Sequence, residues 1–378
     1  MAEIVHVPLD NGRAYDIHIG AGLLARVGEI VKGVARSNRV VIVSQPPITK
    51  HYRQAVADSL SDAGFDVDAV LFPAGERYKN LRTLESLYGR LYNLHPAIDR
   101  KTLLVALGGG VVGDVVGFLA ATYLRGLDYV QIPTTLLAMV DSSVGGKTGI
   151  DYQAGKNLVG AFHQPRAVIA DTDALATLPR RHLASGLAEI IKYGVIRDAE
   201  VLQKASRGID FLRRGDQETT AFLVRRSCEI KADVVTKDEY ETTGLRAILN
   251  FGHTIGHAVE SATQYRRYKH GEAIAIGMVS AALIGEKVGA TPPGTVLFDI
   301  RTACLTAGLP CDLPGDVSDD DLIALLGRDK KAENGVAKFV LARAIGDVVT
   351  GVTVDERAIR AGLAIHRANY SAPKGSKS

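Results

Sequence analysis

The chain has 378 residues, of which 46% are hydrophobic, 23% charged and 6% aromatic, and its formal net charge is +3. This length exceeds what one hydrophobic core usually serves, so we expect two domains, and the composition excludes a disordered or fibrous protein. Lysine and arginine are scattered and aromatic residues are few, which argues against a nucleic-acid partner and favours a small anionic ligand.

The cysteines and the apolar segments indicate the compartment in which the protein works. Cys228, Cys304 and Cys311 have neither a paired framework nor a CxxC spacing, so we expect free thiols in a reducing compartment. Residues 1–4 lack the basic and apolar regions of a signal peptide. The longest apolar run, Ala273–Gly285, is too short to span a bilayer. We therefore expect a cytoplasmic protein with no membrane partner.

The first ~175 residues alternate short β-rich runs with helical patterns, which predicts a parallel sheet covered by helices. The predicted strands are Arg39–Ser44, Asp66–Leu71, Thr102–Leu107, Tyr129–Ile132 and Ala167–Ala170. The predicted helices between them include His51–Ala63 and Leu81–Asn93. Two stretches rich in glycine and hydroxyl side chains are expected to be ligand-facing loops, Pro133–Thr135 and Asp141–Gly155.

Beyond Pro179 the pattern changes to long segments with a 3.6-residue period, which predict helices. These segments are Leu183–Leu202, Thr219–Val235 and Phe251–Ala262. The sequence therefore predicts an α/β domain over residues 1–178, a helical domain over residues 179–370 and a flexible tail over residues 371–378.

A strand that runs into a glycine-rich turn is typical of dinucleotide binding. The apolar run Lys101–Leu107 leads directly into Gly108–Asp114, in which the first, third and sixth residues satisfy GxGxxG. Without Cβ atoms, backbone N–H groups can approach a diphosphate closely, and the helix N-terminus adds a partial positive charge. A tight turn that only packs a helix on a strand is the alternative, but the strand–turn–helix context favours a cofactor.

Two lysines in glycine-rich segments are candidates for binding an anion. Gly145–Thr148 resembles the end of a P-loop, but Asp141 stands where that motif requires its first glycine, so the motif fails. We interpret Lys147 as a point charge for a phosphate or a carboxylate, with a solvated loop lysine as the alternative. Lys156 has the same two interpretations.

A histidine-rich segment predicts a metal site. His253 and His257 are spaced i, i+4 and so share one helical face, and His270 opens the next helical segment. Two or three imidazoles near a carboxylate form a ligand set that Zn²⁺ accepts with an open position. Glu189 is the candidate carboxylate, because it lies on an otherwise apolar helical face where a bare charge is costly. Hydrogen-bonded core histidines are the alternative.

These blocks occur in the order found in the 3-dehydroquinate synthases, which the chain resembles from Tyr15 to about Gly346. The blocks that carry the resemblance are Pro73–Lys79, Gly108–Asp114, Pro133–Lys147, Gly155–Asn157, Ala188–Gly194, Leu249–His257, His270–Glu272 and Asp329–Lys331. The resemblance implies a Rossmann-like NAD-binding domain, an all-helical metal- and substrate-binding domain, and an active site in the cleft between them. It also implies NAD and Zn²⁺ or Co²⁺ as cofactors, and a homodimer.

The resemblance further implies roles for individual residues. The metal ligands would be Glu189, His253 and His270. The NAD contacts would be Glu76, Lys79, Gly108, Gly109, Gly110, Val111, Val112, Gly113, Asp114, Thr134, Thr135, Lys147, Lys156, Leu175 and Thr177. The catalytic residues would be Lys147, Lys192, Lys231, Arg246, Asn250 and, as proton handler or hydrogen bonder, His257. The other substrate contacts would be Asp141, Asn157, Lys330, Lys331 and, across the dimer to the substrate phosphate, Arg125.

Two adjacent positions depart from the resemblance. Ser44 and Gln45 stand where many members of that family carry an acid or an amide near the adenosine ribose. We therefore predict no particular residue for the ribose contact.

The implied reaction converts 3-deoxy-D-arabino-heptulosonate 7-phosphate into 3-dehydroquinate and phosphate. Transient oxidation of a ring hydroxyl by NAD⁺ acidifies the adjacent C–H so that phosphate leaves; the hydride then returns, the ring opens, and an aldol addition closes the carbocycle. Two alternatives are a metal-dependent polyol or glycerol-phosphate dehydrogenase and a cyclase that makes an inosose or a valiolone. A third alternative is a nucleotide-phosphate-binding module or P-loop phosphotransferase without redox chemistry, which Asp141 and the Glu/His/His set argue against.

Overall fold

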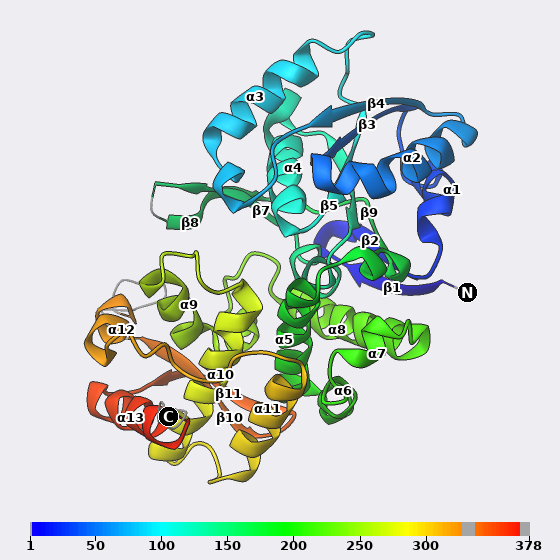
Figure 1. The fold of residues 1–378 in the computed structure, drawn as a ribbon. Helices are drawn as coiled ribbons and strands as arrows, with labels where there is room; N and C mark the ends of the chain where they lie inside the picture. The colour runs from blue at the N-terminus through cyan, green and yellow to red at the C-terminus, as the bar shows by residue number, and fades with distance from the viewer. Residues whose placement is uncertain (1, 154, 327–336, 371–378) are drawn as a thin grey trace, which may run out of the picture. The chain divides into compact units, whose positions relative to one another are not determined.

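The computed structural model describes residues 2–153, 155–326 and 337–370, and the chain divides into two compact units (Figure 1). The first unit comprises Met1–Leu178 and Gly215–Tyr240, and the second comprises Pro179–Arg214 and Glu241–Ser378. Among the described helices, none combines the length and the apolarity needed to cross a membrane. The cysteines are buried and free, as the sequence predicted.

A seven-stranded sheet with the order β1-β2-β9-β6-β5-β3-β4 forms the centre of the first unit. The strands β1 and β2 pair antiparallel, and all other neighbours in this sheet are parallel, as predicted. The strands are β1 (Glu3–Pro8), β2 (Ala14–Gly20), β3 (Arg39–Ser44), β4 (Asp66–Leu71), β5 (Leu103–Gly108), β6 (Asp128–Pro133) and β9 (Ala167–Asp171), beside a separate hairpin of β7 (Lys147–Tyr152) and β8 (Gly155–Phe162).

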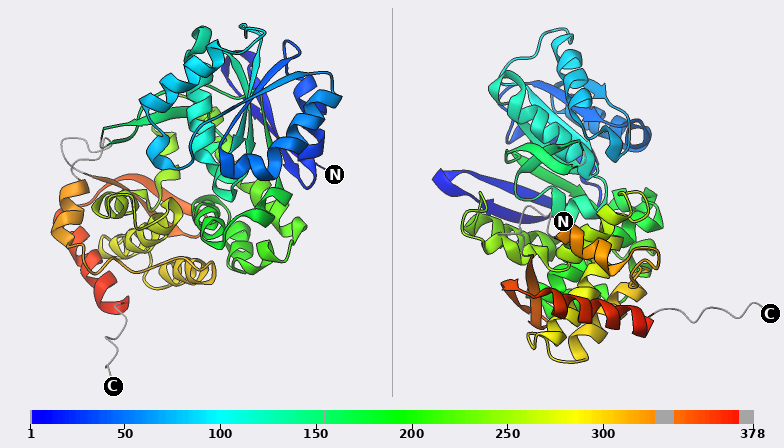
Figure 2. Two further views of the ribbon diagram at one scale, coloured as in Figure 1. Left: turned by 45° about the horizontal axis from the view of Figure 1, so that its top comes forward. Right: turned by 90° about the vertical axis from the view of Figure 1, so that its left-hand side faces the viewer.

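Helices cover both faces of this sheet, because alternate side chains of a strand point in opposite directions. In β3, Val40 and Ile42 pack in one cluster with α1 and α2, whereas Val41 and Val43 pack in another with α3 and α4. The left view of Figure 2 shows the strands between these two pairs of helices. The helices of this unit are α1 (Val27–Lys32), α2 (Pro46–Asp62), α3 (Leu81–Tyr92), α4 (Gly110–Thr122) and α8 (Gln217–Lys237), with the short turns η1 (Asp10–Gly12), η2 (Leu23–Arg26), η3 (Glu76–Tyr78), η4 (Tyr123–Arg125), η5 (Ala138–Ser142) and η6 (Thr172–Thr177).

The central element of the second unit is α10 (His270–Lys287). It packs on α9, α13, α5, α11 and β10, so it is apolar on nearly every side. The other elements are α5 (Arg180–Arg197), α6 (Ala199–Ala205), α7 (Asp210–Arg213), η7 (Leu245–Asn250), α9 (His253–Ala262), α11 (Thr295–Thr306), α12 (Asp319–Leu326), α13 (Glu356–Tyr370) and the antiparallel hairpin β10 (Lys338–Ala344) and β11 (Asp347–Thr353).

Three expectations about the fold need correction. The helix α8 belongs to the first unit and not to a helical domain over residues 179–370, because it packs on β1, β2 and η5. The second unit is not all-helical, since β10 pairs with β11. The stretch Asp141–Gly155 is not one loop, because it includes β7, whose backbone pairs with β8. The tail expected over residues 371–378 lies outside the described residues.

Candidate active site

Glu189 lies in α5 and is fully buried among apolar residues of that helix. A carboxylate in such a place is costly unless positive groups compensate it. Its two oxygens face different partners: Oε2 pairs with Lys192, one turn further along α5, and Oε1 faces His253 and His270. Oε1 is therefore placed to bind a cation together with both imidazoles.

His253 is the first residue of α9. Its Nδ1 lies 3.1 Å from the carbonyl oxygen of Phe251, and its Nε2 lies 3.7 Å from Oε1 of Glu189. An N–H on Nδ1 can donate to that carbonyl, which leaves the lone pair of Nε2 directed at the carboxylate. Burial lowers the pKa of His253 well below its usual value, although Glu189 opposes the shift. The imidazole is therefore neutral, which is the form that binds a metal.

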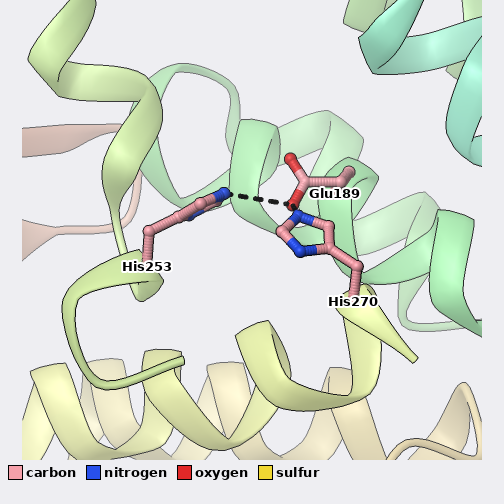
Figure 3. A group of neighbouring side chains, drawn as sticks. All are labelled: Glu189, His253 and His270. Carbon is pink, nitrogen blue, oxygen red and sulfur yellow. Dashed lines mark ion pairs between the residues drawn. The ribbon is translucent and has the colours of Figure 1, made fainter. Parts of the chain in front are cut away.

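His270 begins α10 and comes close to Glu189 because a glycine follows it. A Cβ on Gly271 would lie 2.0 Å from the carbonyl oxygen of Ser185, one turn before Glu189 in α5, so a larger residue would force the two helices apart. The backbone N–H of Gly271 also donates to Oγ of Ser185 at 3.0 Å. As a result, Nε2 of His270 lies 3.6 Å from Oε1 of Glu189. Figure 3 shows the two imidazoles, from α9 and α10, directed toward this carboxylate.

The ligand atoms of Glu189, His253 and His270 all lie within 4.8 Å of one another. Two imidazole nitrogens and one carboxylate oxygen are a set used by catalytic Zn²⁺, which keeps a further position open. Burial lowers the pKa of His270, but hydrogen bonds to the carboxylates of Glu189 and Glu260 outweigh burial and raise it to about 10. The cluster therefore favours a positive charge, and both its chemistry and its charge fit a divalent cation.

Three further predicted residues lie on η7 and α9 beside this cluster. The ring centroid of His257 is 5.2 Å from that of His253. Arg246 and Asn250 belong to η7, which directly precedes α9. Arg246 is buried, and its Nε lies 3.9 Å from Oε1 of Glu241. The second unit thus carries a histidine on α9, and a buried arginine and an amide on the turn that precedes α9.

The predicted glycine turn lies where β5 leads into α4. Gly108 ends the strand, Gly109 precedes the helix with an extended backbone, and Gly110 opens the helix. A Cβ on Gly109 would lie 3.0 Å from Cγ2 of Thr135, and one on Gly110 would lie 3.1 Å from Oγ of Ser142. Because first-turn N–H groups lack intrahelical acceptors, this helix start is suited to bind an anion.

The remaining turn residues support the helix. A Cβ on Gly113 would lie 2.6 Å from Oε1 of Gln131 in β6, so the third glycine of the motif permits close packing of helix on sheet. Val112 is fully buried, and Val111 packs against the same apolar cluster. The side chain of Val112 and the missing side chain of Gly113 therefore serve the packing of α4 on the sheet.

Lys79 is the centre of a polar cluster that joins residues far apart in the sequence. Its Nζ donates to Oδ2 of Asp114 at 2.6 Å and to Oδ1 of Asn157, and its side chain is 5% exposed. Burial lowers the pKa of Lys79, but the charges of Asp114 and Glu76 outweigh burial and raise it above its usual value. Lys156 of β8 lies 3.8 Å from Oε1 of Glu76. Four predicted NAD residues and one predicted substrate residue are therefore neighbours.

Four other predicted NAD residues follow the carboxyl ends of β6 and β9. The backbone N–H of Thr134 donates to the carbonyl of Gly108 at 3.0 Å, and Oγ1 of Thr135 accepts from the backbone N–H of Ala138 at 3.2 Å. Leu175 is buried in η6, and the hydroxyl of Thr177 in the same turn bonds with that of Tyr52.

Ser44 and Gln45, at the end of β3, both bond within the protein. Oγ of Ser44 donates to the carbonyl of Leu107 at 2.7 Å. Nε2 of Gln45 donates to the carbonyl of Pro73 at 3.1 Å. These bonds tie β3 to β5 and to the segment after β4.

Asp141 lies in η5, a π-helical turn, which is a rare conformation that is frequent at functional sites. Nζ of Lys231, in α8, donates to Oδ1 of Asp141 at 2.6 Å and to its backbone carbonyl at 2.7 Å. Two predicted substrate residues are therefore bonded to each other. Lys147 begins β7, and its side chain is exposed.

Arg125 lies on an exposed turn at the end of α4. It has a φ of 65° and follows Leu124, with a φ of 51°, so two successive side-chain-bearing residues occupy the left-handed region. Such a conformation costs energy and is enriched at functional positions. Lys330 and Lys331 lie outside the described residues.

The sequence pattern did not indicate two further carboxylates of these clusters, the half-buried Asp151 and the buried Glu260. Oδ1 of Asp151 accepts from the backbone N–H of Asn157 at 2.9 Å, and burial raises the pKa of Asp151. Oε2 of Glu260 lies 3.5 Å from Nδ1 of His270. The spacing of Glu260, seven residues after His253 on one helix, was the signal that could have revealed it.

Comparison with solved structures places this architecture among the sugar phosphate cyclases. The structure of 2-epi-5-epi-valiolone synthase from Streptomyces hygroscopicus subsp. jinggangensis 5008, with NAD⁺ and Zn²⁺ bound, is similar with a TM-score of 0.85 and 28% identity, covering 94% of this chain and 97% of that chain. A 2-deoxy-scyllo-inosose synthase complexed with carbaglucose-6-phosphate, NAD⁺ and Co²⁺ is similar with a TM-score of 0.83 and 26% identity, covering 96% and 99%.

The sequence narrows this class to one family. The 3-dehydroquinate synthase N-terminal family matches residues 69–185, and the 3-dehydroquinate synthase C-terminal family matches residues 186–332. The 3-dehydroquinate synthase of Gloeobacter violaceus is 46% identical over 356 residues, which cover 94% of this chain and 96% of that protein. The chain belongs to the 3-dehydroquinate synthase family, which confirms the family and the fold class predicted from the sequence.

Proposed function

We propose that this protein is a 3-dehydroquinate synthase, which converts 3-deoxy-D-arabino-heptulosonate 7-phosphate into 3-dehydroquinate and phosphate. The observation that carries the proposal is the cluster of the buried Glu189 with the partly buried His253 and His270 in a chain of this family. The family match also disfavours the dehydrogenase and phosphotransferase alternatives, because curated relatives at this identity are named 3-dehydroquinate synthase.

Two cofactors would bind to residues described above. Glu189, His253 and His270 would hold one divalent cation, Zn²⁺ or Co²⁺, which when bound supplies a Lewis acid for oxygen atoms of the substrate. NAD would supply a reversible hydride acceptor. The residues proposed to hold it are Glu76, Lys79, Gly108, Gly109, Gly110, Val111, Val112, Gly113, Asp114, Thr134, Thr135, Lys147, Lys156, Leu175 and Thr177.

The substrate carries a carboxylate and a phosphate, and we assign cationic side chains to both. The guanidinium of Arg246 suits a bidentate contact with a carboxylate, and its burial strengthens such a contact. Lys147, Lys192 and Lys231 are point charges for the remaining anionic oxygens. Lys192 would also keep Oε2 of Glu189 occupied, so that Oε1 is left for the cation.

Uncharged and titratable groups would orient the hydroxyls and handle protons. His257, whose ring lies next to that of His253, is placed to hold or accept a proton. Asn250, Asn157 and Asp141 would hydrogen-bond substrate hydroxyls, and Lys231 fixes the direction of Asp141.

We further propose that the protein acts as a cytoplasmic homodimer in which Arg125 binds the substrate phosphate of the partner's site. The exposed, left-handed turn at Leu124 and Arg125 supports this role, because two adjacent residues hold a costly conformation there. Mixing an Arg125→Ala variant with a Lys192→Ala variant should restore activity to a fraction of the dimers. No recovery after confirmed subunit exchange would argue against a shared site.

The fate of the hydride tests the proposed function. With the heptulosonate phosphate as substrate, catalytic NAD⁺ should support many turnovers, and one phosphate should be released for each substrate consumed. Deuterium on the oxidised carbon should be retained in the product, because the same cofactor molecule returns it. Net accumulation of NADH without phosphate release would refute the proposal and indicate a dehydrogenase, and an inosose or valiolone product from a sugar phosphate would indicate another cyclase.

A further inference from the structure

The geometry points to Glu260 as the positioning residue for His270, acting from the far side of the imidazole to aim Nε2 at the metal. This inference rests on the metal cluster proposed above and adds a fourth residue to it. Glu260 faces Nδ1 of His270, the ring nitrogen away from Glu189, so its effect would pass through the ring of His270.

The ring of His270 has a carboxylate oxygen opposite each nitrogen. Nε2 lies 3.6 Å from Oε1 of Glu189, and Nδ1 lies 3.5 Å from Oε2 of Glu260. Glu260 is buried, with 4% of its side chain exposed, so its charge acts on the ring with little screening by water. A carboxylate held against the second nitrogen of a metal-bound histidine fixes its tautomer and orientation and makes it a more basic ligand.

The two histidines of the cluster are supported unequally. Nδ1 of His253 faces a neutral backbone carbonyl, that of Phe251, whereas Nδ1 of His270 faces a charged side chain. The backbone support cannot be removed by substitution, but the carboxylate can. A substitution of Glu260 can therefore change the basicity of His270 as a ligand without replacing any of the three ligands.

The same helix supplies both a ligand and this support. His253 and Glu260 lie seven residues apart in α9, so they share one helical face, with His257 between them. A competing interpretation is that His257, Glu260 and His270 hold a cation of their own, since their ligand atoms also lie within 4.8 Å. That arrangement would require Nδ1 of His270 to lose its proton while Nε2 serves the first cation, so we favour the positioning role.

Titration of the full-length apo protein with Co²⁺ tests the inference, with the visible absorption of bound Co²⁺ as the readout. The parent should bind one equivalent, and Glu260→Gln should also bind one, with an affinity about 10–100-fold lower and a changed absorption spectrum. Glu260→Asp, which retains the charge, should recover part of the lost affinity. Thermal melting of each apo protein verifies that the variants are folded.

Glu239→Gln is the matched control, because Glu239 is also a buried, ion-paired glutamate, bonded to Arg13 in the first unit. Its Co²⁺ affinity should equal that of the parent even where its stability falls. A Glu260→Gln variant with parental affinity and spectrum would overturn the inference, and so would a parent that binds two equivalents of which the variant loses one. A parent that binds no Co²⁺ would overturn the metal cluster as well, whereas the turnover assay with NAD⁺ tests the proposed reaction separately.

Discussion

Replacement of Gly271 by alanine should damage both the stability of the second unit and its metal binding, because the added methyl group has no room. The new Cβ would lie 2.0 Å from the carbonyl oxygen of Ser185 and 2.7 Å from its carbonyl carbon, whereas ordinary contacts begin at 3.4 Å. Both are backbone atoms of α5 and cannot rotate away. The start of α10 must therefore move, and His270 must move with it away from Glu189.

The expected loss of stability is that of an overpacked core, about 1–3 kcal/mol. In a unit of this size each kcal/mol lowers the melting temperature by about 2–4 °C. Displacement of a ligand by about 1 Å should weaken metal binding at least about tenfold. Thermal melting of the apo protein and Co²⁺ titration measure the two effects.

Gly89→Ala is the control for adding a methyl group to a helix. Gly89 lies within α3, and a Cβ there would meet nothing within 4 Å. That variant should match the parent or gain up to about 1 kcal/mol, since alanine is the better helix former. A Gly271→Ala protein that melts and binds Co²⁺ like the parent would refute the packing argument.

Three further outcomes follow from the structure. His253→Ala should lose tightly bound metal on dialysis, as measured by elemental analysis, because a ligand is removed; retention of a full equivalent would contradict the ligand set. Lys156→Ala should raise the KM for NAD⁺ about tenfold, while stability changes by less than about 1 kcal/mol because its ion pair with Glu76 is partly exposed. Burial lowers the pKa of His366, so the native state favours the neutral ring. The resulting contribution to the free energy of unfolding is present above the usual pKa of histidine. It is lost as the pH falls below that value, by up to about 1.4 kcal/mol per pH unit. In His366→Gln the free energy of unfolding, measured with urea, should fall less steeply as the pH is lowered. An unchanged pH dependence would exclude His366 as its source.

The sheet could be predicted where its strands are buried on both faces. The predicted bounds of β3 agree with the structure, because a continuous β-branched run is typical of a central parallel strand. The predicted bounds of β4 also agree, although β4 is the edge strand and is only partly buried. The helix α2 begins at Pro46, five residues before its predicted start. Proline usually breaks a helix, but it is tolerated in the first turn. The hairpin of β7 and β8 was missed because β8 is largely exposed and glycine-rich, so no apolar pattern marks it.

The candidate site could be predicted only in part, since motifs show residue types but not their distances. The residue pattern alone indicated Glu189 and three histidines as candidate metal ligands. The family resemblance then selected two of the three histidines, His253 and His270. The roles of Gly271 and Glu260 depend on contacts between helices, and the spacing of Glu260 could show only that it shares a helical face with His253. The bond from Gly271 to Ser185 joins residues 86 positions apart, and only the packing of α10 on α5 brings them together.

The divided first unit constrains the order in which the protein can fold during synthesis. Domains generally fold as they leave the ribosome, N-terminal part first. Here the helix that packs on β1 and β2 is α8, which is translated only after α5, α6 and α7 of the other unit. The nascent sheet must therefore wait, with part of its surface uncovered, until about residue 240 has emerged. A fragment ending at Leu178 would keep that surface exposed permanently, so a chain shortened at this apparent boundary should aggregate.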